Sequence, residues 1–302
     1  MNSDTKFVTL PDGRQIAYAE YGDPNGLPTL YCHGFPGSRL EAKLFEGPAA
    51  KYNLRVLAPD RNGLGQSDAK PGRSLLDWSI EVDTFLDILN IKEYLLIGVS
   101  GGAPYALACA HQSPSRILGL TLVCPLGPLN QQELLDSMRW PARVNFKAIR
   151  DIPILSNISF RFFITPMANL WPKSIYQLML MLAPAADSKV LIRSEVRNII
   201  TGSIHESIRQ GSDAILHEML LYTQDWGFDI SEIHVPVQLW HGKEDETVPI
   251  IHGISLANTL INCSSHFIEG EGHFSLPIDY ADTIQAQCIS AISTHTDDSN
   301  PD

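Results

Sequence analysis

Short apolar runs alternate with segments of helical periodicity along most of the chain. Two runs on either side of the turn Pro11-Asp12-Gly13 predict an opening hairpin, over 7–10 and 15–21. Further runs predict buried strands at 28–32, 54–58, 95–99, 117–124, 235–240 and 265–268. Helical patterns lie at 40–45, 74–89, 103–108, 250–260 and 277–292. This alternation predicts an α/β fold with a mostly parallel central sheet that helices cover on both faces.

The alternation stops after the sixth predicted strand, which ends at Cys124. Residues 129–232 have helical patterns and no clear strand pattern. We therefore expect a helical cap inserted into the sheet domain, and a division into 1–127 (first part of the core), 128–232 (cap) and 233–302 (second part of the core). Ser38 is expected to cap the helix at 40–45, and the polar residues 295–302 are expected to form a disordered tail.

The cap differs in composition from the core. Residues 128–232 hold ten Lys and Arg against eleven Asp and Glu, so their net charge is −1 and the rest of the chain carries −11. Every methionine except Met1 lies in this segment, together with Trp140, Trp171 and Trp226. Two compatible interpretations are an adaptable apolar lid over a pocket and a small helical layer that needs these side chains for its own core.

A Gly-x-Ser-x-Gly motif follows the predicted strand at 95–99. Gly98 and Gly102 lack a Cβ, so strand and helix can approach closely while Ser100 stands on a tight, exposed turn. A chance match in a loop is the alternative, although a chain of this length should contain only on the order of 0.1 such matches. The position between a strand and a helix favours Ser100 as a nucleophile.

A serine nucleophile needs a base and a group that orients the base. His273 lies in a glycine-containing loop after the last predicted strand, where the imidazole can reach over the strand ends. Asp245 lies in the loop after the preceding strand, and its neighbours Glu244 and Glu246 are expected to be solvated. The order serine, acid, histidine fits this arrangement.

An oxyanion hole needs two backbone N–H groups. Gly101 follows the nucleophile and is expected to supply one of them. The second is expected from the loop His33-Gly34-Phe35-Pro36-Gly37, where Phe35 is the better donor because Pro36 has no N–H. His33 and Gly34 are expected to support this loop, and His33 to orient it through hydrogen bonds rather than to act as the base.

Composition and charge narrow the remaining possibilities. The net charge of −12 and the absence of a visible basic face argue against nucleic acid and anionic membranes as partners. No stretch predicts a secretory signal or a membrane anchor, and the five cysteines are expected to be mostly buried free thiols in a reducing cytoplasm.

Neither a metal site nor a nucleotide site is expected, because the histidines are scattered and the glycine-rich turn at 60–65 lacks a phosphate-binding spacing. That turn and His241 are interpreted as structural.

Together these motifs resemble those of the α/β-hydrolase superfamily. The similar segments are His33–Gly37, Asp60–Ser67, Gly98–Gly102, His241–Pro249 and Gly270–His273. The resemblance implies a Ser100–His273–Asp245 triad, no cofactor, and hydrolysis through an acyl-enzyme. Relatives that open epoxides or remove halide carry aspartate at the nucleophile position, where this chain has Ser100.

We therefore expect a carboxylesterase that acts on small to medium apolar acyl esters. Its activity should fall on acidification through a pKa of about 6 to 7, because the base must be neutral. Hydrolysis of an amide, thioester, lactone or carbon–carbon bond is the alternative within enzymes, and a non-catalytic ligand sensor is the alternative outside them. The sequence leaves the natural substrate and the oligomeric state open.

Overall fold

The computed structural model describes residues 5–297 and contains one eight-stranded sheet of order β1-β2-β4-β3-β5-β6-β7-β8. The strands are β1 (Lys6–Thr9), β2 (Gln15–Gly22), β3 (Leu27–Cys32), β4 (Leu54–Pro59), β5 (Tyr94–Val99), β6 (Ile117–Val123), β7 (Val237–Gly242) and β8 (Cys263–Ile268). Strands β1 and β2 pair antiparallel to each other, and β2 pairs antiparallel to β4; the other pairings are parallel. The predicted opening hairpin and the mostly parallel sheet are both confirmed.

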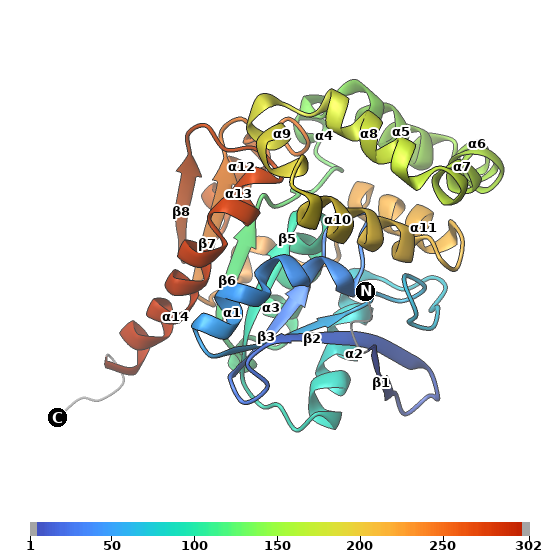
Figure 1. Ribbon diagram of the computed structural model, residues 1–302. Coiled ribbons are helices and arrows are strands. Elements are labelled where there is room, and N and C mark those ends of the chain that lie inside the picture. The colour runs from blue at the N-terminus through green and yellow to red at the C-terminus, as the bar shows by residue number, and fades with distance from the viewer. Residues whose placement is uncertain (1–4, 298–302) are drawn as a thin grey trace.

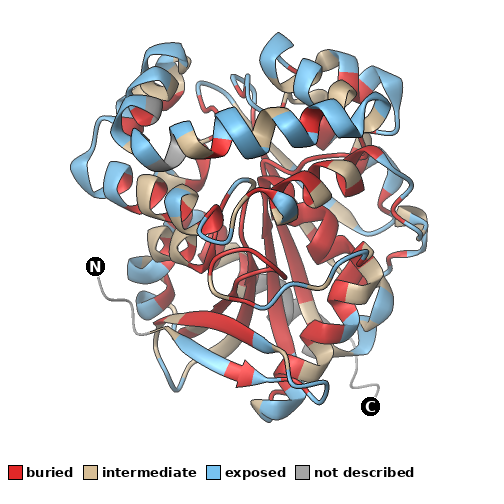
Figure 2. Ribbon diagram, turned by 90° about the vertical axis from the view of Figure 1, so that its right-hand side faces the viewer, coloured by how far each residue is buried: buried red, intermediate tan, exposed pale blue. Residues whose placement is uncertain are grey.

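The centre of the sheet is apolar on both faces, as expected for parallel strands beneath helices. All six residues of β5 are buried, and Figure 2 shows the central strands enclosed within the molecule. Helices α2 (Leu75–Ile88), α3 (Ala103–Gln112) and α12 (Ile251–Thr259) pack in one hydrophobic cluster with the sheet. Helices α1 (Glu46–Lys51), α13 (Ser275–Asp279) and α14 (Ala281–Asp297) contribute to a second cluster with the sheet.

Two predicted helix ends differ from the structure. Ser38 precedes a 3₁₀ helix, η1 (Arg39–Phe45), and does not cap it: the Ser38 N–H donates a hydrogen bond to Ser203 Oγ at 2.8 Å. Serine is a good cap only where its hydroxyl faces the free N–H groups of the first turn, which Ser74 achieves for α2. Helix α14 extends to Asp297, past the start of the expected tail, and 298–302 lie outside the described residues.

Between β6 and β7 lies a helical segment of the chain, which we call the cap. Its helices are α4 (Gln132–Ser137), α5 (Trp140–Asp151), α6 (Pro153–Ser159), the π-helical turn η4 (Phe160–Ile164), α7 (Thr165–Leu170), α8 (Pro172–Leu182), α9 (Ala185–Leu191), α10 (Ser194–Ser207) and α11 (Asp213–Thr223). They lie over the carboxyl ends of the parallel strands (Figure 1). Many large apolar side chains are exposed on them, including Phe162, Phe163 and Met181. Within the described part of the chain, no helix is both long and apolar enough to cross a membrane.

Candidate active site

Ser100 stands on a strained turn between β5 and α3. Its φ of 52° lies in the left-handed region, which costs free energy for a residue with a Cβ and is typical of a nucleophile on such a turn. A Cβ on Gly102 would lie 2.1 Å from the carbonyl oxygen of Cys32, and one on Gly98 would lie 2.7 Å from Cβ of Ala106. The close approach of strand and helix therefore requires glycine at both positions.

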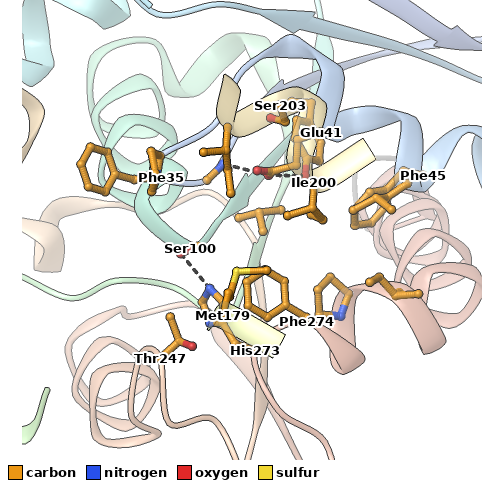
Figure 3. Close-up of a pocket in the computed structure, with 18 residues that line it drawn as sticks. Phe35, Glu41, Phe45, Ser100, Met179, Ile200, Ser203, Thr247, His273 and Phe274 are labelled. Carbon is orange, nitrogen blue, oxygen red and sulfur yellow. Dashed lines mark hydrogen bonds between the residues drawn. The ribbon is translucent and has the colours of Figure 1, made fainter. Parts of the chain in front are cut away.

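Ser100, His273 and Asp245 form a hydrogen-bonded series. The distance between Ser100 Oγ and His273 Nε2 is 3.0 Å, and that between His273 Nδ1 and Asp245 Oδ2 is 2.8 Å. Figure 3 shows the Ser100–His273 contact at the edge of a pocket. The other Asp245 oxygen accepts the N–H groups of Thr247 at 2.9 Å and Val248 at 2.8 Å, which fixes the carboxylate. The three predicted catalytic side chains thus meet, although they come from three separate loops.

Asp245 and His273 shift each other's pKa. Burial disfavours the charge on both side chains, but their mutual attraction outweighs it. The pKa of Asp245 is well below its ordinary value because His273 and His241 stabilise the carboxylate. Although burial opposes it, the charge and hydrogen bond of Asp245 raise the pKa of His273 above 6.5. Asp245 therefore remains a carboxylate, and the protonated form of His273 is stabilised beside it.

Phe35 and Gly101 lie side by side next to the nucleophile. A Cβ on Gly101 would be 2.6 Å from Phe35 Cβ. Among the described residues, the N–H of Phe35 has no acceptor, whereas the neighbouring Gly34 N–H donates to Glu41 Oε1 at 2.8 Å. Phe35 rather than Gly34 therefore has a backbone donor available for a substrate oxygen.

A buried arginine holds this loop from behind. Arg61 donates to the carbonyl oxygens of His33 and Gly34, and its guanidinium makes a two-point ion pair with Glu218 of α11, at 2.6 and 2.8 Å. His33 is fully buried, and its Nδ1 lies 2.9 Å from the Gly34 carbonyl oxygen. Burial, with the nearby charge of Arg61, lowers the pKa of His33 to about 3. His33 is therefore neutral, and its ring nitrogens contact the Gly34 carbonyl oxygen and the Arg61 N–H. The turn at 60–65 is structural, as interpreted, but the sequence carried no signal for its partner Glu218.

The loop that carries His273 is held by a residue of the cap. Asp187 of α9 is fully buried, and its carboxylate accepts three consecutive backbone N–H groups, from His273 at 3.2 Å, Phe274 at 2.8 Å and Ser275 at 2.9 Å. A Cβ on Gly272 would lie 2.5 Å from Asp187 Oδ1, so the carboxylate fits only against glycine. Sequence analysis missed Asp187, since a single aspartate in a helical segment carries no local signal.

Two cavities meet at Ser100. One, of about 240 Å³, is lined by His273, Glu41 and apolar side chains of η1, α8, α10 and α13, including Phe45, Met179 and Ile200. The other, of about 290 Å³, is lined by Gly101 and apolar side chains of the cap, including Met138, Phe146 and Met219. We call them the histidine-side cavity and the cap-side cavity. A substrate carbonyl at Ser100 would have one apolar cavity for each of its two substituents.

Among the described residues, one group of three side chains has potential metal-ligand atoms close together: Cys124, Asp245 and His273. Two of these three atoms already hydrogen-bond to each other, and burial keeps the pKa of Cys124 well above its ordinary value, so that the thiolate a metal would need is disfavoured. Cys32, Cys109, Cys124 and Cys288 are buried free thiols, and Cys263 is partly buried. His241 Nε2 lies 2.8 Å from the Val248 carbonyl oxygen and 3.3 Å from Asp245 Oδ2, so it supports the acid loop.

Known proteins share this architecture. The chain is 26% identical over 295 residues to a non-heme haloperoxidase of Rhodococcus erythropolis, covering 95% of this chain and 99% of that one. Its fold is similar to that of a bromoperoxidase of Bacillus anthracis (TM-score 0.72, 16% identity, 96% and 100% covered). It is also similar to an esterase of Exiguobacterium antarcticum (TM-score 0.69, 16% identity, 95% and 99% covered). The family model described as alpha/beta hydrolase fold matches residues 28–279. This chain, with its eight-stranded sheet and helical cap, therefore belongs to the alpha/beta hydrolase family.

Proposed function

We propose that this protein is a serine hydrolase that cleaves carboxylic esters with small to medium apolar acyl groups. The observation that carries the proposal is the series Ser100–His273–Asp245, with its distances of 3.0 and 2.8 Å, placed where two apolar cavities meet. The series supplies a nucleophile, a base and a fixed carboxylate, and the cavities supply room for the two sides of an ester.

The reaction begins when Ser100 Oγ attacks the ester carbonyl carbon and its proton passes to His273 Nε2. Asp245 stabilises the imidazolium, and the N–H groups of Phe35 and Gly101 bind the negative oxygen of the tetrahedral intermediate. The bond to the alkoxy oxygen then breaks, and His273 returns the proton to the leaving alcohol. Water attacks the acyl-enzyme by the same route, giving its proton to His273, and Ser100 regains a proton as the acid leaves.

The lining of the cavities supports an apolar acyl group. Apart from Ser100 itself and Gly101, the cap-side cavity is lined by Leu, Ile, Val, Met, Phe, Pro and Ala, with Asn145 and Thr247 as polar exceptions. An acyl chain of moderate length would replace water there, and each buried methylene contributes about 0.8 kcal/mol. An acyl group with a charged end would find no lining side chain of opposite charge in this cavity.

Substitution of the nucleophile tests the proposal. Ser100→Ala should abolish hydrolysis of a chromogenic butyrate ester and labelling by a fluorophosphonate, because no other group can form the acyl-enzyme. Circular dichroism should be unchanged. As a matched control, Ser194→Ala removes an exposed hydroxyl outside both cavities and should behave as the wild type.

The same two measurements separate the alternatives. Labelling of Ser100 without turnover of any ester would favour a ligand-sensing protein. Turnover of amides, thioesters or lactones at higher kcat/KM than matched esters would move the assignment to another bond type. Undiminished ester hydrolysis by Ser100→Ala would overturn the proposed mechanism.

A further inference from the structure

One carboxyl group lies in the otherwise largely apolar histidine-side cavity. Glu41 of η1 lines this cavity together with Phe45, Met179 and Ile200. Figure 3 shows Glu41, Ile200 and Ser203 on one side of the pocket and Thr247, His273 and Phe274 on the other. Burial raises the pKa of Glu41 above its ordinary value, so the placement costs free energy that an apolar side chain would not.

The hydrogen bonds of Glu41 use only one of its two oxygens. Oε1 accepts the Gly34 N–H at 2.8 Å and the Tyr31 hydroxyl at 2.9 Å. For Oε2 the described residues provide no hydrogen-bond donor. A Cβ on Gly34 would lie 3.1 Å from Oε2 and 3.5 Å from Ser100 Cβ, so Gly34 lies between this oxygen and Ser100, and both Glu41 and Ser100 line the same cavity. Glu41 is half-buried, and Oε2 is free to accept a hydrogen bond from a ligand in this cavity.

The position of His273 decides which part of an ester enters this cavity. His273 must return its proton to the leaving alkoxy oxygen, so the alcohol portion lies on the imidazole side of the tetrahedral intermediate. His273 lines the histidine-side cavity and not the cap-side one, whereas Gly101 lines only the cap-side cavity. The alcohol portion therefore faces Glu41, and the acyl portion extends into the cap-side cavity.

We propose that Glu41 is a specificity-determining residue that selects esters whose alcohol portion carries a second hydroxyl group, which donates a hydrogen bond to Glu41 Oε2. This inference rests on the proposed esterase function. A hydroxyl is favoured over an ammonium group because His273, on the same cavity, becomes positively charged during the reaction and would repel a second cation. Esters of simple alkanols would leave Oε2 without a partner.

Matched substrates test the inference on the wild-type protein. Hexanoate esters of 1,2-ethanediol, 1,3-propanediol and 1,4-butanediol are compared with the propyl, butyl and pentyl esters, which replace the terminal hydroxyl by a methyl group. For at least one pair, kcat/KM should be about 10-fold to 100-fold higher for the hydroxyalkyl ester, as for a hydrogen bond to a charged group. Moving the hydroxyl to the end of the acyl chain should remove the preference.

Two variants separate recognition from loop support. Glu41→Gln keeps an acceptor for the Gly34 N–H but presents an amide donor to the cavity. It should therefore raise kcat/KM for methoxyalkyl esters, which only accept hydrogen bonds, relative to hydroxyalkyl esters by about 10-fold. Glu46→Gln makes the same change at an exposed glutamate of α1 that lines neither cavity, and it should leave that ratio unchanged.

Three results would overturn the inference. The first is a preference of the wild type for the alkyl ester in every pair, a result that requires no variant. A purely supporting role of Glu41 would lower all rates in Glu41→Gln by the same factor and leave the ratio of methoxyalkyl to hydroxyalkyl esters as in the wild type. If the wild type hydrolyses none of these esters, the proposed function itself fails, and the inference fails with it.

Discussion

Asp245 and His273 are both buried, and each favours the charged form of the other. The carboxylate accepts hydrogen bonds from two backbone N–H groups and from the imidazole, so all its strong acceptor positions face donors. In the proposed mechanism, its negative charge stabilises the imidazolium and orients the ring toward Ser100. The proposed role of His273 therefore depends on a residue 28 positions away in the sequence.

Removal of the Asp245 charge should move the pH dependence in a defined direction. Because the carboxylate raises the pKa of His273, the active neutral imidazole appears only at higher pH in the wild type. In Asp245→Asn the acid limb of the kcat/KM profile should shift to lower pH, while kcat falls by about 10⁴-fold. Glu246→Gln, at an exposed neighbour, is the control. An acid limb at unchanged pH in Asp245→Asn would contradict the role of His273 as base.

At the scale of elements, the turn from β5 to α3 depends on the absence of side-chain atoms. Gly102→Ala would place Cβ 2.1 Å from the Cys32 carbonyl oxygen, and a backbone atom in the sheet cannot move away. We expect a loss of about 1 to 3 kcal/mol in the free energy of unfolding, or more. Gly202→Ala, within α10 and with nothing inside 4 Å, should instead stabilise by about 0.5 to 1 kcal/mol. Urea unfolding of both variants measures the contrast.

Helix α9 positions the His273 loop through Asp187. Asp187→Asn puts an amide donor among three backbone N–H donors and removes a charge that helps to raise the pKa of His273. We expect kcat/KM to fall by about 100-fold through misplacement of the imidazole, with the acid limb of the pH profile at lower pH. Lys189→Met removes partly exposed ion pairs of the same helix and should change little. If Asp187→Asn loses stability but keeps the wild-type pH profile, Asp187 only supports the fold.

Across the whole molecule, cap and core are joined by charges that have no access to water. Arg61 of the core and Glu218 of the cap are fully buried, and Arg73 also contacts Glu218 at 3.0 Å. The Arg61 guanidinium also donates hydrogen bonds to the carbonyl oxygens of His33 and Gly34. One ion pair therefore both attaches the cap to the core and positions the loop of His33 and Gly34.

This ion pair should make stability depend on pH. Burial alone would raise the pKa of Glu218, but the charges of Arg61 and Arg73 lower it to about 2. A depressed folded-state pKa stabilises the protein above the unfolded value of 4.5, and this contribution is lost as the pH falls toward 2. Glu218→Gln should cost about 3 to 5 kcal/mol at neutral pH, and its difference from the wild type should shrink below about pH 4.5. A difference that is constant from pH 7 to 3 would contradict this account.

Much of the fold and the proposed catalytic residues could be predicted from the sequence. Apolar runs predicted the strands, and the glycines on either side of Ser100 indicated the tight turn that carries it. His273 and Asp245 were found because chemistry demands such partners and the fold brings strand-end loops together. The helix boundaries near Ser38 and Asp297 were less accurate, since they depend on contacts such as that of Ser38 with Ser203.

The sequence by itself predicted the layered sheet, the inserted helices and a candidate nucleophile on a tight turn, because each of these leaves a local pattern: apolar runs, helical periodicity and the glycines around Ser100. Only the tertiary structure decided how the loops are held and what the substrate meets. Asp187 contacts a loop 86 positions away, and Arg61 pairs with a residue 157 positions away. The carboxylate of Glu41 lines an otherwise largely apolar cavity. Such contacts form between buried polar groups that each need a partner, and packing rather than local pattern selects which partner is in reach.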